Sequence, residues 1–289
     1  MRGTRVGMAV AKGAACLKWR IQNNQQLMNI LKTTILLAAA CALTSSQTFA
    51  GTPATPMAAP AKSRVSGTLS LTVDTHFISY GADTWAGGNS FSNALFHPQL
   101  EIGVQMSEEL KLIFGSWWDV NDKAVSSIGG KVQEVDLWAG FAYTAGKVTY
   151  TMLYQEWMYA GASERIVDLK VGYDTFLKPT LTLHGRVDGN GGQEEGVVGV
   201  LSGSYDFAAG PVNFSIPGAV AVVTDGYHGG DAGFAYASLG LQGSIALKGA
   251  FDGTTLSAGV TYYHTEDSVL PGNVDSDFLT GNIGVSFSF

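Results

Sequence analysis

The feature that most constrains the fold is an alternation of apolar and polar side chains, which recurs along residues 65–289 without any helical period of useful length. In the final stretch NIGVSFSF, Ile283, Val285, Phe287 and Phe289 share one face, and small or polar residues take the other. A period of two places successive side chains on opposite faces of a β-strand. The chain is therefore expected to be all-β, with strands that each have one apolar face.

Twelve such stretches can be counted: about 65–81, 95–106, 110–120, 131–143, 147–158, 164–175, 179–188, 196–207, 211–224, 233–247, 253–264 and 276–289. The connections alternate between short ones, such as SEE at 107–109 and TAG at 144–146, and mostly longer, Gly-rich or acidic ones. Short turns at one end and long loops at the other are typical of outer-membrane barrels. In lipid every backbone polar group must be paired, so a sheet there closes on itself. The sequence predicts a transmembrane antiparallel up-and-down β-barrel of about 12 strands.

The front of the chain has the layout of a secretory signal peptide. From Met28 it has a basic Lys32, an apolar run over 35–43, and the small residue Ala50 before Gly51, where cleavage is expected. Residues 1–27 have no place in such a signal and are interpreted as lying upstream of the true start. Leu37 to Cys41 (LAAAC) loosely resembles a lipoprotein cleavage site, which is the alternative.

The expected domains are therefore a signal peptide at 28–50, a flexible tether rich in Pro, Ala and Thr at 51–64, and the barrel at 65–289. Without residues 1–50 the chain keeps 11 of its 17 basic residues and all 24 acidic ones, a formal charge of −13. This balance argues against nucleic acid as a partner, because phosphates require Lys and Arg. Both cysteines are removed, so no disulfide is expected. Nothing in the sequence indicates a cofactor or the oligomeric state.

Aromatic residues gather toward the expected strand ends, where an interfacial girdle would lie. The set is Trp117, Trp118, Trp138, Tyr150, Tyr154, Trp157, Tyr159, Tyr262 and Tyr263.

The ending resembles a known signal. Asn282, Gly284, Phe287 and Phe289 match the C-terminal assembly signal of bacterial outer-membrane barrels, which implies recognition by the barrel-assembly machinery. Segments FISYGADTW (77–85), FHPQLEIG (96–103) and EVDLWAGF (134–141) resemble the TorF-like group of small porins over about half of the mature chain. The pair Trp117 and Trp118 departs from that pattern, where a single aromatic is expected. The resemblance implies outer-membrane lipid and lipopolysaccharide as surroundings.

The polar face of the strands is expected to line the lumen. Its charged members, the candidate pore-lining residues, are Asp74, Glu101, Lys111, Asp119, Glu134, Asp136, Asp168, Lys170, His184 and Arg186. A bore of twelve strands is narrow, since barrel diameter grows with strand number. These features predict a channel for passive diffusion of small hydrophilic solutes or ions, with mild cation preference. The alternative is a barrel whose lumen charges pair and plug it, acting through its outer loops.

A third function class is an outer-membrane lipid hydrolase. His76 and His264 lie near outer strand ends with Ser79 and Ser268 nearby, but no G-x-S-x-G motif occurs and nothing orients either imidazole. No catalytic residue is therefore assigned. Acidic residues in the loops, such as Asp119 and Asp122, lack the rest of a calcium-binding loop. No metal site is assigned either.

Overall fold

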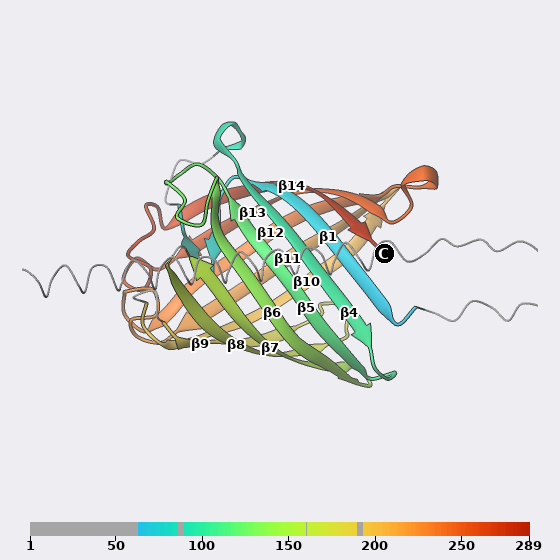
Figure 1. Ribbon diagram of the computed structural model, residues 1–289, viewed down its shortest axis with the longest axis horizontal. Helices are drawn as coiled ribbons and strands as arrows, with labels where there is room; N and C mark the ends of the chain where they lie inside the picture. The colour runs from blue at the N-terminus through green and yellow to red at the C-terminus, as the bar shows by residue number, and fades with distance from the viewer. Residues whose placement is uncertain (1–62, 86–89, 160, 190–192) are drawn as a thin grey trace, which may run out of the picture. The chain divides into compact units, whose positions relative to one another are not determined.

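Closure of the sheet into a barrel turns the apolar faces of the strands outward and their polar faces toward the lumen. The structure, a computed structural model, describes residues 63–85, 90–159, 161–189 and 193–289. In this part of the chain twelve antiparallel strands form a closed barrel in chain order, and β1 pairs with both β4 and β14 (Figure 1). The predicted fold class is confirmed. The strands are β1 (Val65–Asp74), β4 (Leu95–Gln105), β5 (Leu110–Val120), β6 (Val132–Ala145), β7 (Val148–Tyr159), β8 (Ala162–Tyr173), β9 (Thr180–Asp188), β10 (Gly196–Ala209), β11 (Val212–Val223), β12 (Gly233–Ala246), β13 (Thr254–Thr265) and β14 (Asp277–Ser288).

The connections differ between the two ends of the barrel. At the end where β1 begins and β14 finishes, here the turn end, β6 and β7 are joined through Gly146, and β10 and β11 through Gly210, both at φ 61°. Glycine suits these turns because residues with a side chain rarely adopt a positive φ. The opposite end, here the loop end, has the longer connections 121–131, 224–232 and 266–276, although 160–161 is short.

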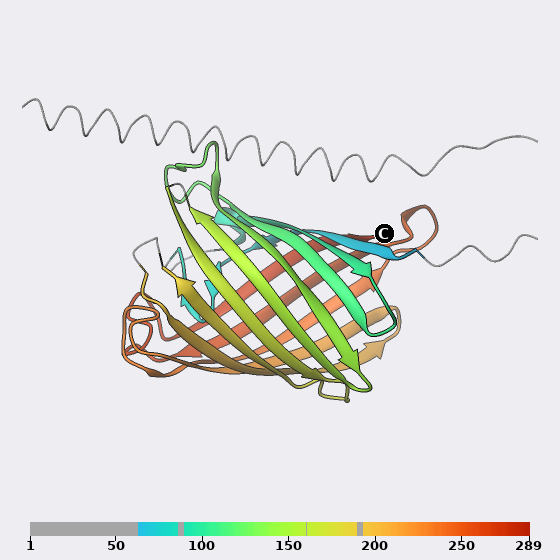
Figure 2. The same ribbon diagram turned by 60° about the horizontal axis from the view of Figure 1, so that its bottom comes forward.

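The first predicted strand, 65–81, is wrong beyond Asp74. After β1 the chain folds back into a two-stranded hairpin, in which β2 (Ile78–Ser79) pairs with β3 (Ala82–Asp83). Tyr80 (φ 48°) and Gly81 (φ 95°) form the turn, and two consecutive positive φ values are typical of a type I′ hairpin. The hairpin, drawn as short teal arrows, lies within the outline of the barrel near the loop end in both views (Figures 1 and 2). Residues 75–85 are called the hairpin segment below.

Apolar side chains inside the barrel form two clusters. The larger joins inward residues of β10, β11 and β12 to loop residues, including Tyr227, Val269 and Leu270, and Tyr80 of the hairpin segment packs against it. The smaller consists of Ile113, Ala142 and Leu153, with Trp138 against it. The larger cluster fixes the loops at the loop end of the barrel. Two short 3₁₀ turns, η1 (Phe91–Asn93) and η2 (Gly249–Phe251), complete the described elements.

The expected upstream segment 1–27, the signal peptide 28–50 with its cleavage site at Ala50 and Gly51, and nearly all of the tether 51–64 lie outside the described residues. They stay predictions. In the described part of the chain no helix is long and apolar enough to cross a membrane.

Candidate functional site: the barrel lumen

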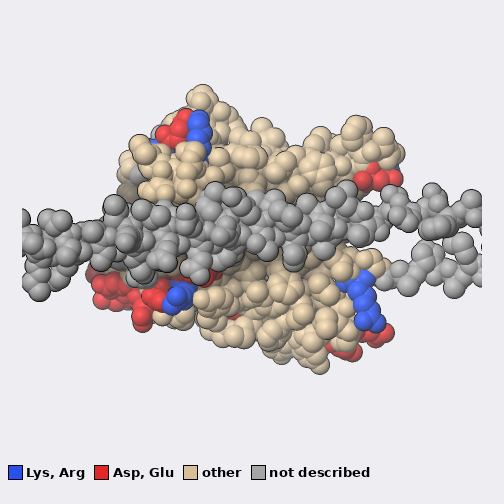
Figure 3. Space-filling view, viewed as in Figure 1, with Lys and Arg blue, Asp and Glu red and all other residues tan. Residues whose placement is uncertain are grey.

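The outward surface of the barrel is apolar along most of its strands. The exposed large side chains alternate along the strands, for example Tyr150, Met152 and Tyr154 on β7 and Leu256, Val260 and Tyr262 on β13. On the face seen in the space-filling view, the visible charged side chains gather toward the two ends of the barrel (Figure 3). A closed barrel removes every sheet edge and pairs its backbone internally, as lipid requires. This is the surface of an outer-membrane barrel.

The register of the strands places the ten candidate pore-lining residues on the inward face. On β8 and β9, Asp168 lies opposite His184, and Lys170 lies opposite Thr182. On β5 and β6, Asp119 lies opposite Glu134. Glu101 and Lys111 lie nearer the turn end, whereas Asp74, Asp119, Glu134, Asp136, Asp168, His184 and Arg186 lie in the half of the barrel near the loop end or at its middle.

A histidine that the sequence analysis missed connects two of these carboxylates. His97 Nδ1 lies 2.8 Å from Asp74 Oδ2, and His97 Nε2 lies 3.2 Å from Asp119 Oδ1. Asp119 is fully buried and accepts further hydrogen bonds from Trp85 Nε1 and Asn121 Nδ2, each 2.7 Å long. An imidazole that donates to both carboxylates carries a proton on each nitrogen. The sequence pattern that could have identified His97 as a lumen residue is its position on the polar face of β4, where it pairs with Thr72 of β1.

A second buried group lies on β8 and β9. His184 Nδ1 is 2.6 Å from Asp168 Oδ1, and Lys170 Nζ is 3.2 Å from Asp168 Oδ2. Tyr80 stacks on the His184 ring with 3.8 Å between ring centroids, and Trp157 lies 5.2 Å from the same ring. The tip of the hairpin segment therefore rests on the buried pair of His184 and Asp168 in the wall.

Arg186 holds three parts of the loop end together. Its Nε donates to Glu164 Oε2 over 2.6 Å, and its Nη1 donates to the carbonyl oxygens of Glu194 and Tyr227, each over 2.9 Å. Its guanidinium carbon lies 3.9 Å from the centroid of the Tyr227 ring. Glu164 was not among the predicted residues, although it also lies on the inward face of β8, opposite Trp157.

The loops at this end also contact the hairpin segment directly. Asn273 of the 266–276 loop donates from Nδ2 to the Gly81 carbonyl over 3.0 Å and accepts from the Asp83 backbone N–H over 2.9 Å. His228 of the 224–232 loop is hydrogen-bonded to the backbone of Tyr80. Burial, with the nearby Arg186 as a second cause, lowers the pKa of His228 to about 4. Burial likewise raises the pKa of Tyr80 and of Tyr227.

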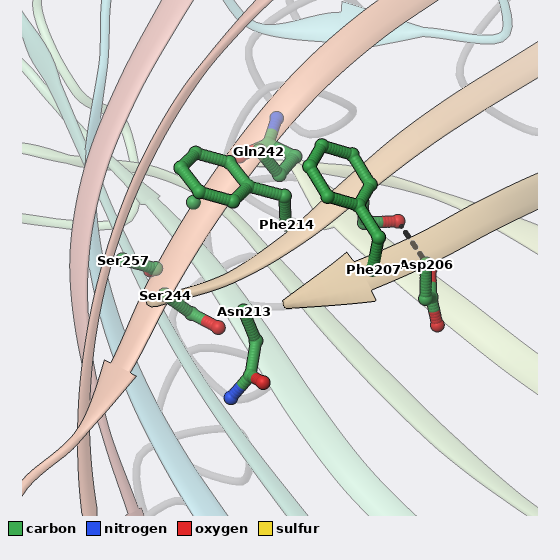
Figure 4. A pocket seen from close by; sticks show the side chains of 9 residues that line it. Asp206, Phe207, Asn213, Phe214, Gln242, Ser244 and Ser257 are labelled. Carbon is green, nitrogen blue, oxygen red and sulfur yellow. Dashed lines mark hydrogen bonds between the residues drawn. The ribbon is translucent and has the colours of Figure 1, made fainter. Parts of the chain in front are cut away.

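Beneath the hairpin segment the lumen contains a cavity of about 530 Å³. Its wall comes from β1, β4, β5, β6, β7, β12, β13 and β14, and its lining includes Asp74, His97, Glu134 and Asp136. We call it the hairpin cavity. A second cavity, of about 380 Å³, lies toward the turn end (Figure 4). There Asp206 accepts a hydrogen bond from Ser215, and Asn213, Gln242 and Ser244 add further polar groups.

The expectation of an aromatic girdle is wrong for five of its nine members. By register Trp117, Trp138, Trp157, Tyr159 and Tyr263 lie on the inward face, and only Trp118, Tyr150, Tyr154 and Tyr262 point outward. The inward rings make specific contacts: Trp117 lies 4.8 Å from both the Phe77 and the His97 rings. An aromatic near a strand end can face either side, and parity along the strand decides which.

The residues of the C-terminal signal divide between the two faces. Asn282 and Gly284 lie inward, and Asn282 lines the hairpin cavity, whereas Phe287 and Phe289 are exposed on the outer surface. Phe289 forms two backbone hydrogen bonds with Gly67 of β1.

His76 and His264, the histidines near candidate serines, are hydrogen-bonded to other side chains. His76 Nδ1 is hydrogen-bonded to Thr75 Oγ1, and His264 Nδ1 lies 2.9 Å from Asp277 Oδ1 at the outer surface. Ser268 is hydrogen-bonded to Glu266. Within the described ranges neither imidazole is hydrogen-bonded to a serine. No group of three or more His, Cys, Asp and Glu residues there could hold a metal ion.

Comparison with known proteins gives distant similarities of structure. No family model matches the chain, and no curated protein matches its sequence. A solved structure of the NanC porin is 11% identical, with 76% of this chain and 98% of that one covered and a TM-score of 0.46. An outer-membrane channel from Pseudomonas putida F1 is 12% identical, with 83% of this chain and 100% of that one covered and a TM-score of 0.47. These similarities are too low to carry an argument about the function of this chain.

Proposed function

We propose that this chain is an outer-membrane channel through which small hydrophilic solutes or ions diffuse passively along a narrow, charged lumen. The observation that supports this most is the hairpin cavity, a polar space of about 530 Å³ inside the wall of the barrel. Its lining carries Asp74, Glu134 and Asp136 and neither lysine nor arginine, so acidic side chains are in excess along the proposed path. Rings of acidic side chains favour cations in channels.

The proposed path runs along the β1 and β4 side of the lumen, away from the apolar clusters on β10–β12 and on β5–β7. From the cavity toward the turn end, the inward positions on this side include Gln99, Glu101 and Gln105 of β4 and Lys111 of β5. Such groups can replace part of the hydration of a passing solute. Opposite charges at Glu101 and Lys111 would orient polar solutes in the bore.

The proposed partners follow from the outer surface and the last strand. Outer-membrane lipid and lipopolysaccharide would contact the exposed apolar side chains and the loop end. The barrel-assembly machinery would act on β14, where Phe287 and Phe289 are exposed at 40% and 67%. We propose no catalytic role.

The test is single-channel conductance of residues 51–289, refolded and inserted in planar bilayers. We expect discrete current steps, with a cation preference that falls in Asp136→Asn and rises in Lys170→Ala, because each change removes one charge from the inward face. The matched control is Asp188→Asn, a change in an exposed ion pair with Arg165. A folded barrel that passes no current would overturn the proposal.

One observation favours a second candidate, a plugged barrel that binds partners through its outer loops. The apolar cluster of Tyr227, Val269, Leu270 and the inward residues of β10–β12 packs two loops, and with Tyr80 the hairpin segment, inside the wall. The same conductance experiment separates the two functions. A lipid hydrolase would instead cleave phospholipid in a detergent assay.

A further inference from the structure

The hairpin cavity has carboxyl groups on its wall without matching basic side chains. Asp74, Glu134 and Asp136 line it, and its lining contains neither lysine nor arginine. Two imidazoles lie on the wall: His97 lies between Asp74 and Asp119, and His76 Nε2 lies 4.0 Å from Asp83 Oδ2. Arg186 is engaged with Glu164 instead. Neither Glu134 nor Asp136 has a lysine or arginine partner among the residues that line the cavity.

Glu134 is shielded from water, since it is only 5% exposed, and its carboxyl group is hydrogen-bonded to Asp136 and to Tyr159. Asp136 Oδ1 is buried and has no hydrogen-bond partner. Burying a carboxylate without a partner costs several kcal/mol, by order of magnitude, whereas pairing it with a cation offsets much of that cost. A positively charged ligand in the cavity would supply the missing partner.

Aromatic rings make up much of the remaining wall. Phe77 and Trp117 lie 4.8 Å apart between centroids on one side, and Tyr80 and Trp157 lie 6.4 Å apart, nearly parallel, on another. Ring faces attract ammonium groups and also pack against the apolar carbons attached to them. Metal ions prefer a shell of oxygen or nitrogen ligands. The combination of rings, carboxylates and a space of about 530 Å³ therefore suits an organic cation of modest size.

We propose that the hairpin cavity binds small organic ammonium compounds, with the charged nitrogen beside Glu134 and Asp136 and the apolar groups against Trp117 and Trp157. Because this inference rests on the proposed channel function, it also names the class of solute that the channel selects. The hairpin segment closes the cavity on one side through Phe77 and Tyr80, so it forms part of the recognition surface.

The test measures binding directly, on the refolded barrel in detergent, by titration calorimetry and by tryptophan fluorescence. The probe is choline, and its control is 3,3-dimethyl-1-butanol, which has the same shape without the charge. We expect saturable binding of choline, with quenching of tryptophan fluorescence, and binding of the neutral compound that is weaker by about tenfold or more, as loss of one charge-assisted contact predicts.

Variants localise the site. Asp136→Asn keeps the shape of the side chain and is expected to weaken choline binding by about tenfold. Glu134→Gln serves the same purpose if Asp136→Asn does not refold. Asp206→Asn, in the cavity near the turn end, is the matched control and is expected to leave binding unchanged. Trp117→Leu is expected to weaken choline binding and to reduce the quenching.

Two outcomes would overturn the inference: equal affinity for choline and its neutral analogue, or choline binding that survives both Asp136→Asn and Glu134→Gln. Conductance keeps this result distinct from the proposed function. If the protein conducts current but does not bind choline, the proposed ligand class is wrong and the proposed channel function still stands. If the protein binds choline but conducts no current, the proposed binding site is supported and the proposed channel function is wrong.

Discussion

The backbone of Phe289 pairs with that of Gly67, and the phenylalanine ring lies over the α-carbon of the glycine. The two hydrogen bonds are 2.8 Å (Gly67 N–H to the Phe289 carbonyl) and 3.0 Å (Phe289 N–H to the Gly67 carbonyl). A Cβ atom added at Gly67 would overlap the ring. An aromatic ring that covers a glycine on a neighbouring strand protects the ladder there from solvent. The last residue of the chain thus completes the seam between β1 and β14.

Gly67→Val is expected to destabilise this seam by about 1–3 kcal/mol, because the Phe289 ring must leave its place. The measurement is the urea concentration at the midpoint of unfolding in detergent. The folded fraction at each urea concentration is read from the gel mobility of the barrel. Gly272→Val is the control, since a Cβ there meets nothing within 4 Å. Equal midpoints for the two variants would contradict the role given to the ring.

Arg186→Gln is expected to destabilise the loop end by about 3–5 kcal/mol, because Glu164 is left buried without its cationic partner. Limited proteolysis within 189–195 and 224–232 should quicken, since Arg186 also donates to Glu194 and Tyr227. Arg165→Gln breaks an ion pair with Asp188 in which both side chains are well exposed, and about 1 kcal/mol or less should be lost. If the two variants lost the same stability, burial of the Arg186 pair would have no energetic role.

Tyr80→Ala should raise single-channel conductance, because it removes the side chain that rests on His184 and Trp157 inside the lumen. Loss of a buried aromatic ring costs about 3–5 kcal/mol where the site does not collapse, so the hairpin segment should also loosen. Tyr80→Phe keeps the ring and should resemble the parent protein. An unchanged conductance in Tyr80→Ala would place the narrowest point of the bore elsewhere.

The loop end is expected to open on acidification through His228. Its pKa is lowered from an ordinary value of 6.5 to about 4 by burial and by Arg186, so the packed loop holds the imidazole neutral. The packing is therefore at full strength above pH 6.5 and weakens as pH falls toward 4, by about 3 kcal/mol at most. Protease accessibility of 224–232 against pH measures this. His228→Phe should remove part of the acid response, whereas His264→Gln at the outer surface should retain it.

The wall of the barrel could be predicted from the sequence because the polarity of each strand residue depends on whether its side chain faces lipid or the lumen. This choice alternates along the strand and so gives a period of two. Leu69 and Leu71, for example, lie outward on β1 as their pattern indicates. The inward placement of Asp168 and Arg186 follows from the same parity. The turns at Gly146 and Gly210 were readable because a short connection between two alternating stretches leaves few conformations.

The contents of the lumen could not be predicted in the same way. Phe77 continues the alternation of β1, yet the chain leaves the wall after Asp74. The local sequence signal for this departure is Tyr80–Gly81, where the chain turns back. Contacts such as Tyr80 with His184 join segments that no sequence pattern relates. Nearness to strand ends favours the lipid interface for Trp117 and Trp157, whereas the register places both rings inward. Pairing of Glu164 with Arg186 depends on strand register, which the sequence leaves open.

The hairpin segment has a consequence for the order of assembly. Asp83 and Gly81 bond to Asn273, which follows them by 190 and 192 residues. These contacts can form only after residue 273 has joined the folding barrel. Until then the hairpin segment lacks both hydrogen bonds, so we expect it to reach its final place late in folding.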